Sequence, residues 1–201
     1  MAAYYTLHIA GLTRELKICP ISEKLDIAAF ILFSDVELTE ACARELAKRV
    51  PECDYILTAE SKGIPLAYEM SRQLKVPYIV ARKSVKGYMT DVLSVQVKSI
   101  TTAAVQTLYL DGEKAAWMKG KRVLIVDDVI STGDSLRALQ QLADSWYGIL
   151  SALGFFALLE MLPPELATGC VDISTQLAPH RCGHAVALQA LLKLPYPLAG
   201  L

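Results

Sequence analysis

One segment of the chain, residues 123–135, limits the possible fold more than any other. Four apolar residues, Val123 to Val126, lead directly into two adjacent acids, Asp127 and Asp128. A loop rich in Ser, Thr and Gly follows over residues 128–134, and a helix is expected from Ser135 to about residue 144. A fully apolar run is typical of a strand buried on both faces of a parallel sheet. Because ligands of such sheets bind beyond the carboxyl ends of the strands, the order places two carboxylates at a ligand edge.

The rest of the chain predicts the same kind of sheet. Short apolar runs predict further strands at residues 55–59, 77–81, 105–110 and 148–159. Helical spacing predicts one helix over 38–50, capped by Thr39 and stopped by Pro51, and another that starts at Pro65. From Leu57 onward strands and helices alternate. We therefore predict an α/β fold, a doubly wound and mostly parallel sheet with helices on both faces.

Other segments do not follow this alternation. Residues 4–9 and 14–19 alternate apolar and polar side chains around Gly11, which predicts a β-hairpin that forms a small hood. Residues 83–104 are polar and have no clear period, so we expect a long loop with some hairpin character. The pair Asp111-Gly112 predicts a turn.

Charge divides the chain unevenly. From residue 145 to the end, the only charged residues are Glu160, Glu165, Asp172, Arg181 and Lys193. A soluble domain is usually about 25% charged, and the segment before residue 145 fits that pattern. We therefore expect residues 1–160 to form the core with its hood hairpin and residues 161–201 to form an atypical, charge-poor tail.

Composition excludes several classes of protein. The 20 basic and 21 acidic residues give a formal net charge of −1, which excludes nucleic-acid binding by charge alone, and 53% hydrophobic residues exclude disorder. The run 146–159 holds no charge but is shorter than the ~20 residues of a spanning helix, so a buried strand is expected there instead of a membrane segment. No secretory signal opens the sequence, and the five cysteines lack paired spacing, which favours the reducing cytoplasm.

The segment after the central strand combines two chemistries. Backbone N–H groups and hydroxyls at the start of a helix suit an anion, and phosphate is the obvious one. Two carboxylates repel phosphate, but they can bind sugar hydroxyls or a Mg²⁺ ion shared with a phosphate. Together they predict a phosphorylated sugar as ligand. The alternatives are a turn with a simple helix cap, and a receiver domain, whose acidic pair would lie near the N-terminus.

Residues 123–135 resemble the thirteen-residue signature for phosphoribosyl pyrophosphate (PRPP) of the type I phosphoribosyltransferases. The wider match, roughly residues 4–159, is most similar to the adenine phosphoribosyltransferase-like branch. The resemblance implies that Asp127 and Asp128 are catalytic and hold the ribose hydroxyls, directly or through Mg²⁺. It also implies that the 5′-phosphate is wrapped by Ser131, Thr132, Gly133, Asp134 and Ser135.

A second candidate element follows the strand at 55–59. The sequence Glu60-Ser61-Lys62-Gly63 precedes the helix that starts at Pro65; Gly63 allows a tight turn, and Lys62 with the backbone N–H groups can meet an anion. An ordinary strand–loop–helix junction is the alternative. The resemblance implies that these four residues bind pyrophosphate.

A third candidate element follows the strand at 77–81. Three cations, Arg82, Lys83 and Lys86, stand within five positions, and a solvated charged loop is the alternative. The resemblance implies that all three face the pyrophosphate, with Lys83 among the catalytic residues, and that the loop to about Thr102 is a flap that closes on PRPP. The adenine enzymes usually carry a glutamate in this flap, whereas this chain has none between Glu69 and Glu113.

The resemblance implies a cytoplasmic homodimer that takes PRPP and a nucleobase, with Mg²⁺, and binds neither nucleic acid nor membrane. The expected reaction is transfer of the phosphoribosyl group to a purine-type base, with release of pyrophosphate, as in purine salvage. Because the flap lacks its glutamate and the tail is atypical, a non-catalytic PRPP-binding or regulatory paralogue stays the alternative. The acceptor base and the oligomeric state stay open at this point.

Overall fold

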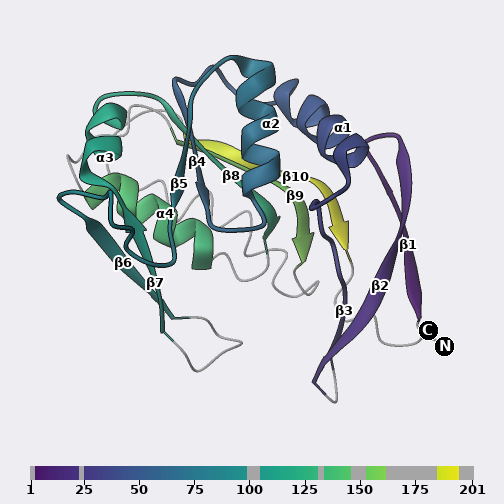
Figure 1. The fold of residues 1–201 in the computed structure, drawn as a ribbon. Coiled ribbons are helices and arrows are strands. Elements are labelled where there is room, and N and C mark those ends of the chain that lie inside the picture. Colours follow the sequence, from purple (N-terminus) through teal and green to yellow (C-terminus); the bar gives the residue numbers. More distant parts are fainter. Residues whose placement is uncertain are drawn as a thin grey trace.

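The computed structural model describes residues 3–22, 25–98, 105–130, 134–145, 153–161 and 185–194. Its centre is a five-stranded parallel sheet with the strand order β10-β9-β8-β4-β5 (Figure 1). These strands are β4 (Tyr55–Ala59), β5 (Tyr78–Ala81), β8 (Val123–Ile130), β9 (Leu153–Met161) and β10 (Ala185–Leu194). The predicted α/β class is thus confirmed, and β10, from the segment predicted as a tail, forms an edge of the sheet.

Helices cover both faces of this sheet. Alternate residues of its strands point to opposite faces, and each set packs with helices in a core of its own. Ile56 and Leu124 pack with α1 (Val36–Ala47) and α2 (Ile64–Leu74). Their neighbours Leu57 and Ile125 pack instead with α4 (Asp134–Ser145) and α3 (Gly112–Met118). Side chains that alternate along a strand point to opposite faces, so an apolar run without polar gaps needs a cover on each side.

The hood is a three-stranded antiparallel sheet of β1 (Tyr4–Ile9), β2 (Leu12–Ser22) and β3 (Leu25–Ala28). Its first turn places Ala10 and Gly11 at φ 52° and 79°, the left-handed pair of a tight hairpin. Leu7, Ile9 and Leu16 enter the same core as α1 and α2, so the hood is packed onto the body of the molecule.

Three boundaries differ from the sequence prediction. Helix α1 is capped by Asp35, whose carboxylate accepts from the Leu38 N–H at 3.0 Å, and not by Thr39, which lies inside the helix. Strand β8 continues through Asp127 and Asp128 instead of ending before them, because residues 127–130 still pair with β9. The expected turn at Asp111-Gly112 is the start of α3.

The predicted flap region contributes β6 (Leu93–Lys98), which pairs in an antiparallel two-stranded sheet with β7 (Val105–Leu110), the strand predicted at 105–110. The loop before it is fastened to the start of α3, where the Gly112 N–H donates to the Thr90 carbonyl at 2.9 Å. A Cβ atom on Gly112 would lie 2.6 Å from the Asp91 carbonyl oxygen, so only glycine allows this approach. Within the residues described, no helix is both long and apolar enough to cross a membrane.

Candidate functional site

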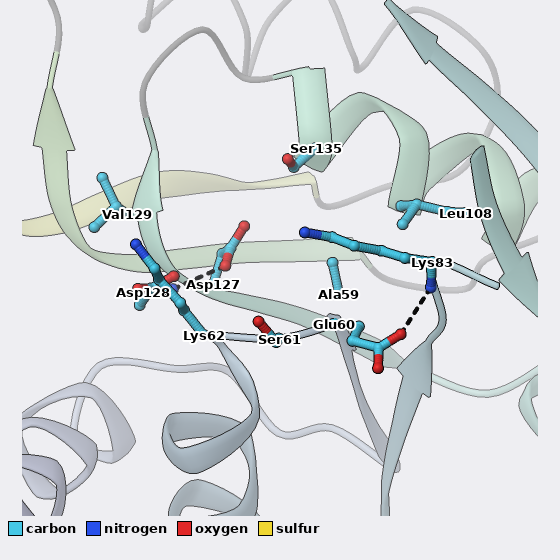
Figure 2. Close-up of a pocket in the computed structure, with 10 residues that line it drawn as sticks. All are labelled: Ala59, Glu60, Ser61, Lys62, Lys83, Leu108, Asp127, Asp128, Val129 and Ser135. Carbon is cyan, nitrogen blue, oxygen red and sulfur yellow. Dashed lines mark hydrogen bonds between the residues drawn. The ribbon is translucent and has the colours of Figure 1, made fainter. Parts of the chain in front are cut away.

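A cavity of about 290 Å³ opens at the carboxyl ends of β4 and β8, the edge where ligands of parallel sheets bind (Figure 2). It is close to the lower end of the size range of small-molecule sites, about 300–1,000 Å³. Its lining comes from five chain segments: Ala59, Glu60, Ser61 and Lys62; Lys83; Leu108; Asp127, Asp128 and Val129; and Ser135. The structure therefore brings together residues from all three predicted elements.

Asp127 and Asp128 form the floor of this cavity. Asp128 is only 5% exposed, and its Oδ2 atom is buried without a hydrogen-bond partner among the described residues. Asp127 accepts the Asp128 N–H through Oδ1 at 3.0 Å. Burial raises the pKa of both carboxyls, and the neighbouring Asp128 charge raises the pKa of Asp127 further. A half-buried carboxylate beside a buried one with an unfilled oxygen is suited to receive a cation or hydroxyl donors.

Two lysines from different loops partly offset this negative charge. Lys62 from the β4–α2 junction and Lys83 from the segment after β5 both extend into the cavity toward the acids (Figure 2). Their charges lower the pKa values of the acids, Lys83 acting on Asp127 and Lys62 on Asp128, but burial dominates in both cases. The cavity thus holds fixed positive groups beside fixed negative groups, which suits a ligand that carries both anionic groups and hydroxyls.

Gly63 lets the loop before α2 approach the acids. A Cβ atom at this position would lie 2.5 Å from Thr58 Oγ1 and 3.0 Å from Asp127 Oδ1. Its φ is −68°, so the need for glycine arises from space and not from the left-handed conformation that a tight turn would require.

Thr58 is the residue of this region that the sequence analysis missed. It is fully buried, and its hydroxyl has no hydrogen-bond partner within the described part of the chain. The available signal was a polar side chain inside the apolar run Tyr55-Ile56-Leu57-Thr58-Ala59.

The remaining predicted cations lie elsewhere. Lys86 donates through Nζ to Ser84 Oγ at 2.7 Å, and Arg82 lies 3.4 Å from Glu60 across an ion pair. Neither residue lines the cavity. The Glu60 carboxylate accepts from the backbone N–H of Lys83 at 2.8 Å, so the second and third elements are joined to each other.

The start of α4 supplies the last wall of the site. Ser135 lines the cavity, and the Asp134 carboxylate accepts from Arg137 Nη2 at 2.8 Å. The predicted phosphate ligands Ser131, Thr132 and Gly133 lie outside the described residues. No cluster of three metal-ligating side chains occurs among the residues that the structure describes.

Comparison with known proteins identifies the family. The model of the phosphoribosyl transferase domain matches residues 36–145, more than half of the chain and including the whole described cavity. This chain belongs to the phosphoribosyltransferase family. The predicted phosphoribosyltransferase family is thus confirmed, and the fold is shared with adenine phosphoribosyltransferases.

Individual relatives agree with this assignment. The hypoxanthine/guanine phosphoribosyltransferase of Methanotorris igneus is 36% identical over 140 residues, which cover 64% of this chain and 71% of the relative. The purine biosynthesis transcriptional repressor PurR of Bacillus subtilis is 28% identical over 124 residues, covering 62% of this chain and 43% of the repressor. Adenine phosphoribosyltransferase from Thermoanaerobacter pseudethanolicus shares the fold, with a TM-score of 0.66 at 20% identity over 89% of this phosphoribosyltransferase and 95% of that chain.

Proposed function

We propose that this phosphoribosyltransferase transfers the 5-phosphoribosyl group of PRPP to a purine-type base and releases pyrophosphate, a reaction of purine salvage. The observation that carries the proposal is the cavity floor, where half-buried Asp127 and buried Asp128, with its unfilled carboxylate oxygen, lie beside two lysines. PRPP carries both kinds of group that such a floor would bind: ribose hydroxyls for the acids and a pyrophosphate for the lysines.

Mg²⁺ fits this site. Asp128 Oδ2 is a buried oxygen without a partner among the described residues, and carboxylate oxygens are ligands that Mg²⁺ accepts. Asp127 and Asp128 would hold the ion or the ribose hydroxyls. A bound Mg²⁺ would supply positive charge close to the leaving pyrophosphate.

The residues of the chain then act mainly by position and charge. The bond between C1 of the ribose and the pyrophosphate oxygen breaks, and the electron pair leaves with the pyrophosphate. The base nitrogen forms the new bond to C1 from the opposite face, and its proton passes to water. Positive charge develops on the ribose in between, and Asp127 and Asp128 stabilise it, while Lys62 and Lys83 hold the departing anion. Ser135 and the preceding loop would hold the 5′-phosphate at the start of α4.

The acceptor is tested by incubating the protein with PRPP, Mg²⁺ and one base at a time, and measuring pyrophosphate. Adenine, hypoxanthine, guanine, xanthine, uracil and orotate form the panel. Hypoxanthine and guanine are the first bases to test, because relatives over 30% identical are named hypoxanthine/guanine phosphoribosyltransferases. We expect release with a purine; release with uracil or orotate alone would contradict the proposal.

A second candidate is a PRPP-binding regulator without turnover. The likeness to the PurR repressor and the absence of a glutamate between Glu69 and Glu113 favour it. Tight PRPP binding in calorimetry, without pyrophosphate release from any base, would support this candidate over the enzyme.

We further propose a homodimer in the cytoplasm. The described cysteines, Cys19, Cys42 and Cys53, are free thiols, which suits a reducing compartment. Phe33, Val36 and Tyr68 are exposed along a second groove of about 410 Å³ beside α1 and α2, and a second copy could cover them. Sedimentation equilibrium tests the assembly, and a monomer at all concentrations would contradict it.

A further inference from the structure

We infer that Glu60 is a positioning residue, which holds the backbone of Lys83 so that the lysine side chain reaches the pyrophosphate end of the cavity. The inference rests on the proposed function and changes the role expected of Glu60, from a group that touches pyrophosphate to one that acts through Lys83.

The backbone N–H of Lys83 lies beyond the end of the strand ladder and takes its acceptor from a side chain. The ladder between β4 and β5 ends with the pair Ala59 and Ala81, and the Glu60 N–H still donates to the Ala81 carbonyl at 2.9 Å. Lys83 lies beyond that ladder. The Glu60 side chain supplies the acceptor for its N–H, at 2.8 Å from Oε2.

The chain just before Lys83 is also held from its other side, by β7. Arg82 and Tyr109 exchange two backbone hydrogen bonds of 2.7 Å, which fasten the chain to β7 just before Lys83. Glu60 and Tyr109 thus hold the start of the loop from opposite sides. A side chain that must meet a ligand at a fixed point needs such support, because a shift of about 1 Å can cost roughly a hundredfold in rate.

The negative charge of the Glu60 carboxylate also favours a role away from the pyrophosphate. A carboxylate that faced a pyrophosphate would repel it, but Figure 2 shows the Glu60 carboxylate directed toward the Lys83 backbone. The Arg82 guanidinium lies 3.4 Å from its other oxygen. The hydrogen bond from Lys83, followed by the cations around it, lowers the pKa of Glu60, so the acceptor stays ionised at neutral pH.

The test separates the hydrogen bond from the charge. Glu60→Gln keeps an acceptor for the Lys83 N–H, whereas Glu60→Ala removes it. We expect Glu60→Ala to weaken binding of inorganic pyrophosphate by about tenfold in calorimetry, and Glu60→Gln by no more than about threefold. Glu45→Ala removes another glutamate, from an exposed ion pair on α1, and serves as the matched control, with unchanged binding.

The double variant tests the route through Lys83. We expect Glu60→Ala to have little further effect in a Lys83→Met background, because the side chain that it positions is absent. Additive losses would overturn the inference, as would equal losses in Glu60→Gln and Glu60→Ala, which would indicate a direct role of the charge.

A measurement on the unaltered protein needs no variant. Amide hydrogen exchange should show the Lys83 N–H protected, and exchange at the rate of a free amide would overturn the inference. If the unaltered protein bound neither pyrophosphate nor PRPP, the proposed function would fail, while hydrogen exchange would still decide whether Glu60 holds Lys83.

Discussion

The acidic side chains on the floor of the cavity, Asp127 and Asp128, have different surroundings from Asp54 and Asp35, which form ion pairs with arginines. Asp54 accepts from the Arg122 guanidinium at 2.9 Å and from the Arg122 backbone N–H at 2.8 Å, and these bonds lower its pKa to about 2. Asp35 is likewise held by Arg14 and caps α1. Asp127 and Asp128 lie instead beside Lys62 and Lys83, and burial raises their pKa values. The carboxylates of Asp54 and Asp35 thus have arginine partners in the protein, whereas Asp128 Oδ2 has no hydrogen-bond partner among the described residues, as expected of an oxygen that receives a ligand.

Removing a cavity acid should have the largest effect. We expect Asp128→Asn to weaken PRPP binding in the presence of Mg²⁺ by about a hundredfold, roughly 3 kcal/mol, because an ionised ligand for the sugar or the metal is lost. The same change should leave the free energy of unfolding unchanged or higher, since a buried charge is removed. Calorimetry and thermal unfolding measure both effects, and unchanged PRPP affinity would show that the site is misplaced.

A methyl group under the loop at the start of α2 should have the next largest effect. Gly63→Ala places a Cβ atom against Thr58 and Asp127, so we expect a loss of stability of about 1–3 kcal/mol together with weaker PRPP binding. Gly87→Ala is the control, because nothing lies within 4 Å of a Cβ there. Equal stability of the two variants would contradict the packing argument.

PRPP binding should depend on pH through the carboxyl groups of Asp127 and Asp128. Because the pKa values of Asp127 and Asp128 are raised, they still take up protons at pH values above about 4, where ordinary carboxyls are ionised. PRPP affinity should therefore rise with pH above that value as the pair becomes charged. Titration of Asp128→Asn corrects for the ionisation of PRPP itself. The same pH dependence in that variant would argue against the acid pair as the source.

The smallest expected effect is that of changing Asp54, in its ion pair with Arg122. Asp54→Asn should cost about 1 kcal/mol of unfolding free energy at neutral pH, since the ion pair is partly exposed, and should leave PRPP binding unchanged. The folded pKa of Asp54 is depressed, so its contribution is present above pH 4 and disappears as the pH falls toward 2. Chemical denaturation at several pH values tests this, and a difference that persists at pH 2 would contradict the assignment.

Sequence could predict what depends on local pattern. The apolar run Val123–Val126 and the alternation of strands and helices were enough for the sheet, and the family match confirms the predicted family. The start of α1 was misplaced because Val36 is exposed and does not belong to the apolar stripe that marks the helix. Helix α3 was missed because its first residue is Gly112, which looks like a turn until the contact with Asp91 is known.

The links between segments could not be predicted in this way. That Glu60 holds Lys83 depends on the register of β4 beside β5, which places residues 59 and 81 opposite each other. The division of the chain at residue 160 and the site roles of individual residues stay predictions. The packing role of Gly63 against Thr58 and Asp127 follows only from three-dimensional proximity.

The most direct test is a crystal structure of the protein with Mg²⁺ and PRPP. We expect electron density for the sugar in the cavity at the ends of β4 and β8, with Asp128 Oδ2 bound to a ribose hydroxyl or to the metal and with Lys83 at the pyrophosphate. Density for PRPP at another place, with the two acids still without a ligand, would contradict this expectation.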